Sequence, residues 1–137
     1  MSETLLDRAF TNYEAARVLL NNMSHDEMFL NIVGYHLQQA VELAIKFLLE
    51  MSGVRYPKIH TIEQLLALGN ENGVDLCKCE YVEDHAEMFT AWESKSRCVL
   101  NYKLEQKKIE RAIAEVEKFL QSIRDAEQGS VKQMNSF

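Results

Sequence analysis

A row of polar side chains interrupts an otherwise apolar stretch near the middle of the chain. The stretch FLNIVGYHLQQAVELAIKFLLE begins at Phe29, and its apolar residues recur at three- and four-residue steps, which predicts a buried helix. The polar residues on this helix are His36, Gln38, Gln39, Glu42 and Lys46. A helix that only fills a core would not need them, so they are the first candidates for a functional site.

Each of these residues also has a purely structural explanation. His36 can transfer protons near neutral pH, but a histidine on an apolar helix is more often held by one hydrogen bond inside the core. Gln38 and Gln39 point about 100° apart on a helix, so only one of them can face the core. Glu42 and Lys46 are one turn apart, and a simple ion pair explains both.

The distribution of charge indicates a second candidate region. The formal net charge is −6, which argues against a surface that coats nucleic acid. From Lys95 to Arg111, however, there are six basic residues against two glutamates. This stretch predicts either a site for one phosphate-bearing ligand or a solvated helix face.

The three cysteines, Cys77, Cys79 and Cys98, cannot all pair within the chain, and a reduced cytosolic protein is the simplest explanation. Cys77 and Cys79 lie near His85, but no second pair of ligands has the spacing of a zinc site. We therefore predict no metal and no cofactor.

Helices must position all of these residues. One proline and five glycines leave few breaks in the chain, which predicts an all-α fold. We expect an up-and-down bundle of four long helices plus one short helix over residues 1–124, and a polar tail over 125–137 that frays. The expected helices cover about 5–21, 25–51, 61–70, 82–99 and 103–124, with capping boxes at Ser24–Glu27 and Thr61–Gln64 and a stop at Gly53.

No apolar run reaches the roughly 18 residues of a membrane span, and the N-terminus lacks a secretory signal, so we expect a cytoplasmic protein.

The central stretch also resembles a known family. Members of the HEPN domain family (higher eukaryotes and prokaryotes nucleotide-binding) commonly contain a segment similar to H-x-Q-Q-A-V-E-x-x-x-K-x-L-L. Here it runs from His36 through Gln38-Gln39-Ala40-Val41-Glu42 and Lys46 to Leu49. The segment from His60 to Leu66 is similar to the family's third helix, and the resemblance extends from about Leu5 to Ile123.

The resemblance implies a helical bundle, similar to the C-terminal domain of kanamycin nucleotidyltransferase, that usually forms a homodimer. Many members are encoded beside a minimal nucleotidyltransferase, as a toxin–antitoxin pair. Active members are metal-independent ribonucleases that carry an arginine, four to six residues and then a histidine late in the fourth helix. Two such sites meet across the dimer.

The residue that matches the family's arginine is Arg97, but no histidine follows it in the expected window. Asn101 and Tyr102 take the expected places, and Asn101 would share a helix face with Arg97. The planar guanidinium of Arg97 suits phosphate, Asn101 can orient a phosphate without transferring a proton, and Tyr102, with an ordinary pKa near 10, is a poor base. In some family toxins a tyrosine near this motif is modified by the partner nucleotidyltransferase, and the residue here would be Tyr102.

We therefore expect a nucleotide- or RNA-associated binding protein, with a polar pocket between the second and fourth helices. Its candidate residues are His36, Gln39, Arg97, Asn101 and Tyr102. One alternative is a toxin-like endoribonuclease that uses Arg97 with a histidine from elsewhere in the chain. The other is a dimeric scaffold without catalysis, in which Arg97 and His36 are buried and satisfy each other. Arg97 by itself also has a structural explanation, an ion pair with Glu93 one turn before it.

Overall fold

The computed structural model describes residues 3–22, 28–58, 61–77, 79–98 and 105–135, with the backbone alone described for residues 28, 95–98 and 130–135. These parts of the chain form six helices and no strand. The helices are α1 (Leu5–Asn22), α2 (Met28–Met51), α3 (Ile62–Glu71), α4 (Glu80–Asp84), α5 (Ala86–Cys98) and α6 (Gln106–Asn135). The prediction of an all-α bundle is confirmed.

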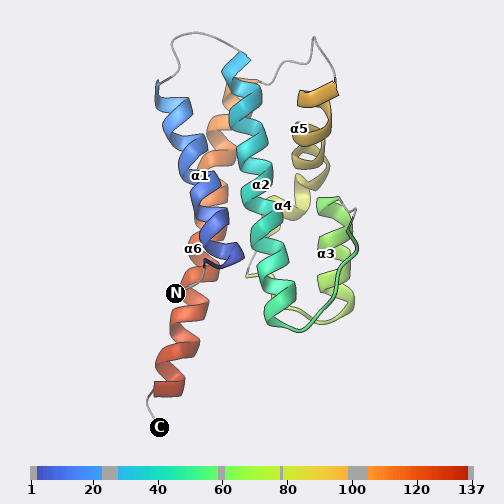
Figure 1. Ribbon diagram of the computed structural model, residues 1–137, viewed down its shortest axis with the longest axis vertical. Coiled ribbons are helices and arrows are strands. Elements are labelled where there is room, and N and C mark those ends of the chain that lie inside the picture. Colours follow the sequence, from blue (N-terminus) through green and yellow to red (C-terminus); the bar gives the residue numbers. More distant parts are fainter. Residues whose placement is uncertain (1–2, 23–27, 59–60, 78, 99–104, 136–137) are drawn as a thin grey trace.

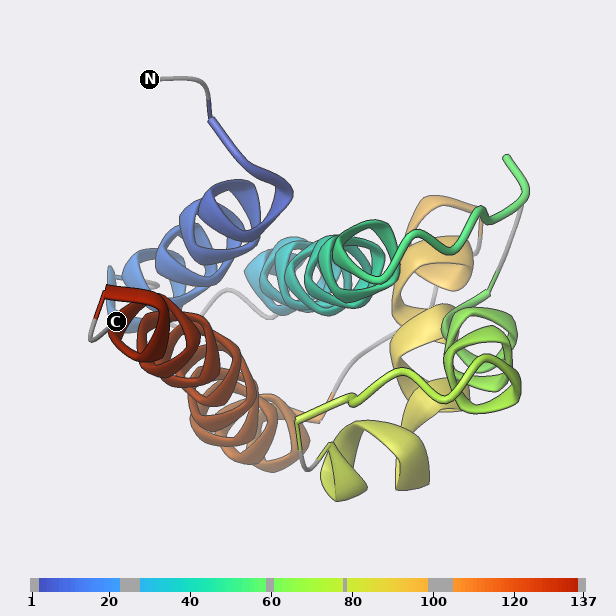
Figure 2. The ribbon, with the colours of Figure 1, turned by 90° about the horizontal axis from the view of Figure 1, so that it is seen from below.

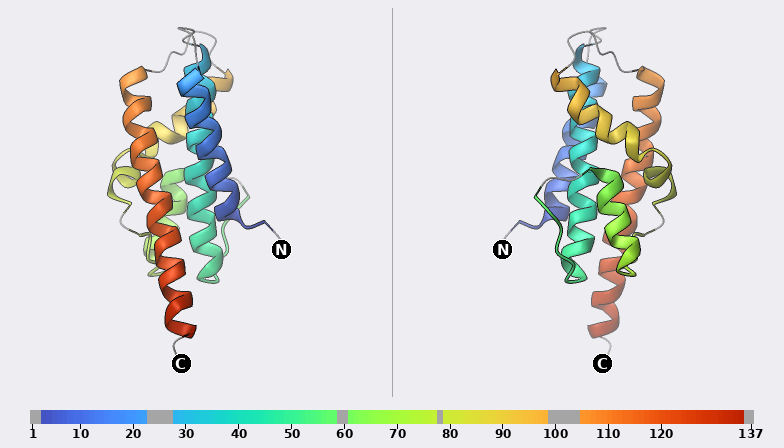
Figure 3. Two further views of the ribbon diagram at one scale, coloured as in Figure 1. Left: turned by 90° about the vertical axis from the view of Figure 1, so that its left-hand side faces the viewer. Right: turned by 90° about the vertical axis from the view of Figure 1, so that its right-hand side faces the viewer.

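Helix α2 lies in the middle of the bundle and contacts α1, α3, α5 and α6 (Figure 2). The four longest helices alternate in direction: α1 rises in Figure 1, α2 descends, α5 rises and α6 descends. Helix α5 runs obliquely across α2 rather than parallel to it (Figure 3). The end of α5, the end of α1 and the start of α2 therefore lie at the same end of the bundle (Figure 1).

The core is built around the apolar surface of α2. Seven of its side chains are fully buried: Val33, Leu37, Ala40, Val41, Ala44, Ile45 and Leu49. Helix α5 contributes Phe89 and Trp92, whose rings meet edge to face at a centroid distance of 5.3 Å. Helix α6 contributes Ile109, Ala112, Val116, Phe119, Leu120 and Ile123. Burying each large apolar side chain stabilises the fold by about 1.5–3 kcal/mol. The prediction that α2 is the central core helix is confirmed.

Capping boxes fix where two of the helices begin. At α3 the hydroxyl of Thr61 accepts from the Gln64 backbone N–H, and the Thr61 N–H donates to the Gln64 side chain, as the sequence predicts. A second box at Thr4 and Asp7 precedes α1; it follows the same spacing, with aspartate in place of glutamate or glutamine. The box expected at Ser24–Glu27 lies outside the described residues.

Helix α2 ends where the sequence predicts. Gly53 has a φ of +73°, a left-handed conformation that costs glycine little, and it follows Met51, the last residue of the helix. The Val54 N–H then donates to the Leu49 carbonyl at 2.9 Å, which satisfies one of the free carbonyls at the helix end.

The structure departs from the sequence-based expectation at two helices. The expected fourth helix is two helices, because the chain leaves helical geometry at His85, between α4 and α5. The His85 ring Nδ1 lies 2.9 Å from the carbonyl of Tyr81, which also accepts the His85 backbone N–H, so the side chain competes with the regular helix bonds.

The last helix does not end near Arg124, so that prediction is wrong. Helix α6 continues to Asn135. Extending an existing helix adds one hydrogen bond for each residue fixed, and Gly129 costs only about 1 kcal/mol relative to alanine. The part of α6 beyond the bundle projects as a single helix toward the C-terminus (Figure 1). The division of the chain at residue 124 into a domain and a tail stays a prediction.

Candidate functional site

His36 is anchored to helix α1 by a hydrogen bond to Asn12. The His36 Nδ1 lies 2.9 Å from the Asn12 Oδ1, and the Asn12 Nδ2 donates to the Arg8 carbonyl at 3.0 Å. Because the second bond fixes the amide orientation, the Asn12 oxygen faces His36 and can only accept. The His36 Nδ1 must therefore carry the proton, and the Nε2 of the neutral ring is an acceptor.

The surroundings of His36 favour this neutral ring. Its side chain is half-buried, and burial lowers its pKa below the ordinary value of 6.5. The ring of Tyr35 lies edge-on to it, with centroids 5.7 Å apart. His36 is therefore neutral at pH 7, and its Nε2 could accept a proton from a bound group.

Gln38 and Gln39 form a hydrogen-bonded pair at the edge of the core. The Gln38 side chain is 1% exposed, whereas that of Gln39 is partly exposed. The Gln39 Nε2 donates to the Gln38 Oε1 at 2.7 Å. The expectation that only one of the two faces the core is confirmed, and the buried amide holds the exposed one in place.

Glu42 and Lys46 form the expected ion pair, with the Lys46 Nζ 3.7 Å from the Glu42 Oε2. Lys46 also lies over the ring of Tyr56, 5.4 Å from its centroid, and the Tyr56 hydroxyl donates to the Glu50 Oε1 at 2.6 Å. Burial and this carboxylate raise the pKa of Tyr56 to about 12. These contacts tie the loop after α2 to the helix, which is a structural role.

Of the predicted pocket residues, only His36 and Gln39 have side chains that the structure describes. Arg97 is the next-to-last residue of α5, and its side chain lies outside the described residues, as do Asn101 and Tyr102. His36 and Gln39 lie about 12 and 16 Å along α2 from Met28, the start of the helix at the same end of the bundle. The described hydrogen bond of His36 runs to Asn12 on α1, and that of Gln39 runs to its neighbour Gln38 on α2.

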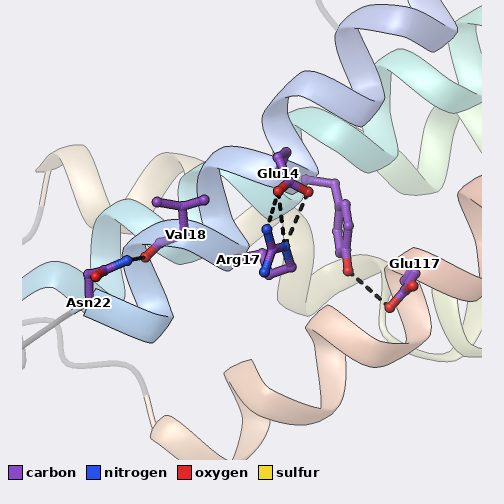
Figure 4. Close-up of polar contacts among 6 residues, drawn as sticks. Glu14, Arg17, Val18, Asn22 and Glu117 are labelled. Carbon is purple, nitrogen blue, oxygen red and sulfur yellow. Dashed lines mark hydrogen bonds and ion pairs between the residues drawn. The ribbon is translucent and has the colours of Figure 1, made fainter.

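Helix α1, which carries Asn12, is held in turn by α6. The Tyr13 hydroxyl donates to the Glu117 Oε2 at 2.9 Å (Figure 4), and burial followed by this bond raises the pKa of Tyr13 to about 12. On the outer face of α1 the guanidinium of Arg17 pairs with Glu14 (Figure 4). Asn12, which orients the His36 ring, therefore lies on a helix whose position is fixed by its contact with α6.

Two cysteines, Cys77 and Cys79, have side chains that the structure describes. Cys79 is buried, and its Sγ lies 3.4 Å from the Glu83 Oε1; burial and this carboxylate raise its pKa to about 12. Cys77 is half-buried at a φ of +54°, and burial raises its pKa as well. Within the described ranges, no three side chains of histidine, cysteine, aspartate or glutamate lie close enough to hold a metal ion. Both thiols stay protonated at neutral pH and are poor nucleophiles.

The model of the HEPN domain matches residues 2–126. The chain belongs to the HEPN domain family. This membership supports a nucleotide- or RNA-related role in general. No curated protein and no solved structure matches the chain. Among the described helices of this HEPN protein, none is long and apolar enough to cross a membrane.

Sequence reasoning missed Asn12, the residue that sets the orientation of the His36 ring. The sequence contains only part of the information needed to find this residue. Asn12 is one turn after Arg8, which predicts that the two share a helix face but does not identify a partner on another helix. A second missed group lies at α4 and α6, where Tyr81, His85 and Arg111 gather. The spacing of Tyr81 and His85 was a usable signal, because residues four apart meet on one helix face.

Proposed function

We propose that this HEPN protein is a cytoplasmic, homodimeric binding protein for RNA or nucleotides, with Arg97 as its phosphate anchor. The observation that carries the proposal is the family match over residues 2–126, and the resemblance of Arg97 to the arginine of the family's motif supports it. A guanidinium presents a planar fork that matches two phosphate oxygens. The excess of basic residues from Lys95 to Arg111 adds attraction for one phosphate group on an otherwise acidic protein.

The chemistry of the motif favours binding over cleavage. Cleaving RNA without a metal needs a base for the 2′-hydroxyl, a cation for the developing charge and an acid for the leaving oxygen. Arg97 supplies a cation, but Asn101 cannot transfer a proton, and Tyr102 needs a strongly lowered pKa to act as a base. A phosphate site requires only the arginine and an oriented donor.

A second candidate, a metal-independent endoribonuclease, is favoured by one observation. His36 carries its proton on Nδ1, so its Nε2 is free to act as a base near neutral pH. This activity requires the Nε2 to come within hydrogen-bonding distance of a nucleotide held by Arg97. The third candidate is a scaffold, for which we expect Arg97 and His36 to hydrogen-bond to each other. The His36 Nδ1 instead bonds to Asn12.

The test compares binding and cleavage of a labelled pool of single-stranded RNA in EDTA. The wild type is measured beside Arg97→Ala and His36→Gln, with Arg17→Ala as the control that removes an exposed arginine from α1. We expect the wild type and Arg17→Ala to bind without cutting. Arg97→Ala should bind about tenfold more weakly or worse, because a charge-assisted hydrogen bond is lost.

Other outcomes decide between the candidates. Cleavage by the wild type that is lost in both Arg97→Ala and His36→Gln would establish the ribonuclease and contradict the binding proposal. Equal binding by the wild type and Arg97→Ala would remove Arg97 as the anchor. No binding by any form would leave the scaffold.

The proposed partners need separate measurements. Light scattering on a size-exclusion column should give twice the monomer mass of 15.9 kDa. A nucleotidyltransferase partner that modifies Tyr102 would attach a nucleotide through its phenolic oxygen and release pyrophosphate from the nucleoside triphosphate. Intact-mass spectrometry after incubation with such an enzyme should then show one added nucleotide, which Tyr102→Phe abolishes; an unchanged mass would contradict this part of the proposal.

A further inference from the structure

A cavity of about 350 Å³ opens between the short helix α4 and the middle of α6. Its lining includes Tyr81 and His85 from the α4 side and Arg111, Glu115, Lys118 and Ser122 from α6. This volume is at the small end of the range for ligand sites. The cavity is a different place from Arg97, which lies about 18 Å further along α5 from His85.

Arg111 lines this cavity without forming an ion pair to a carboxylate of the described residues. Glu115, one turn after it, pairs instead with Lys118, with the Lys118 Nζ 3.5 Å from the Glu115 Oε1. The Arg111 guanidinium lies over the ring of Tyr81, 5.5 Å from its centroid, which leaves its N–H donors available to a ligand. An anionic group of a small molecule is the natural partner for such a fork.

The aromatic pair beside Arg111 is fixed in position. The rings of Tyr81 and His85 are stacked, with centroids 4.1 Å apart and an angle of 24° between the planes. The His85 Nδ1 lies 2.9 Å from the Tyr81 carbonyl, and a carbonyl only accepts, so this nitrogen carries a proton. The two stacked rings line the cavity and give it an aromatic surface that suits a planar group.

The acidic residues that line the cavity restrict the class of molecule that it can bind. Glu80 and Asp84 line the cavity together with Glu115, so three carboxylates accompany Arg111 and Lys118. A polyphosphate or an RNA chain would be repelled by these carboxylates. A small molecule with a single anionic group for Arg111 and amino hydrogens for the carboxylates satisfies both sets of charges.

We propose that the cavity between α4 and α6 binds a small molecule with a planar, amino-bearing ring and one anionic group. The anionic group is either a carboxylate or a phosphate monoester, and it contacts Arg111 while the ring lies beside Tyr81 and His85. This inference does not rest on the role proposed for Arg97.

Isothermal titration of the full-length protein tests this site with four probes. p-Aminobenzoate carries the carboxylate form of the ligand and adenosine monophosphate carries the phosphate form; adenosine and inorganic phosphate each lack one half. At least one of the first two should bind, and adenosine and inorganic phosphate should each bind about tenfold more weakly or worse. Which of the two acids binds identifies the source of the anionic group.

Variants then locate the binding. Arg111→Ala should weaken it by about tenfold or more, whereas Lys107→Ala, an exposed cation on the same helix outside the cavity, should leave it unchanged. Arg97→Ala should also leave it unchanged, so a failure of the RNA proposal and a failure of this one are separable. Binding that survives Arg111→Ala, or the absence of binding by both acids, would overturn the proposal.

Discussion

At the scale of single residues, the most informative contact is the one between His36 and Asn12. It fixes which ring nitrogen carries the proton, because the Asn12 amide is itself oriented by the Arg8 carbonyl. The sequence indicates that His36 has either a structural or a chemical role, but it does not predict the tautomer of the ring. The tautomer depends on Asn12, which lies on another helix and cannot be inferred from residue spacing within α2.

The lowered pKa of His36 gives a pH prediction with a definite sign. In the unfolded chain the ring takes up a proton below about pH 6.5, whereas in the folded protein the proton binds only at lower pH. Between the two pKa values the unfolded state holds more protons, so the free energy of unfolding falls as the pH drops below 6.5. We expect His36→Gln to lose less stability than the wild type between pH 7.5 and 5.5.

Urea unfolding at several pH values measures this difference, since the slope of the wild type against pH should exceed that of the variant. Parallel curves for the two proteins would show that His36 has the same pKa in the folded and unfolded states. His85→Gln serves as the matched control at a histidine outside α1 and α2.

At the scale of elements, the sequence predicts the helix boundaries that local capping signals set and misses those that depend on a wider context. The box at Thr61 and Gln64 is confirmed because both of its partners lie within one turn. The break at His85 and the length of α6 were not predicted, since the first depends on one side chain competing for a carbonyl and the second on propagation from a packed segment.

Thr61→Ala should therefore lower the free energy of unfolding by about 1 kcal/mol, because the first turn of α3 loses its side-chain acceptor. The start of α3 is also tied to α5: the Ile62 N–H donates to the Thr90 hydroxyl at 3.2 Å, and that hydroxyl donates to Glu63 at 2.6 Å. The loss should appear in urea unfolding of the whole bundle.

Thr11→Ala is the control for this experiment. Its hydroxyl bonds back to the Asp7 carbonyl within α1, an arrangement that does not support a helix end, so the change should stay within about 0.5 kcal/mol. Equal losses for the two threonines would show that the capping bond contributes nothing specific.

At the scale of the whole molecule, the apolar periodicity predicts the bundle because one helix carries most of the burial. The sequence places α2 at the centre and orders the helices around it, and the family match covers almost the same span. The pocket expected between α2 and α5 stays a prediction. Its expected members come from separate parts of the chain, and Asn101, Tyr102 and the side chain of Arg97 lie outside the described residues.

The projecting part of α6 gives the last prediction. Among the side chains that the structure describes, which end at Gly129, Ile123 is the last buried one, whereas Asp125, Ala126 and Gln128 are exposed. Deleting residues 128–137 should therefore change the free energy of unfolding by less than about 0.5 kcal/mol, while the far-ultraviolet circular dichroism loses the helical signal of the deleted segment. Ile123→Ala, within the core, should cost about 2–5 kcal/mol.

A loss of more than about 1.5 kcal/mol on this deletion would contradict the picture of α6 as an unsupported extension. The segment would then be packed against something other than its own bundle, and a second copy of the chain is the partner available in a pure sample. Stability that rises with protein concentration in the wild type, but not in the deletion, would identify that contact. A concentration-independent wild type with an unchanged deletion leaves α6 as a helix that continues because nothing in its sequence stops it.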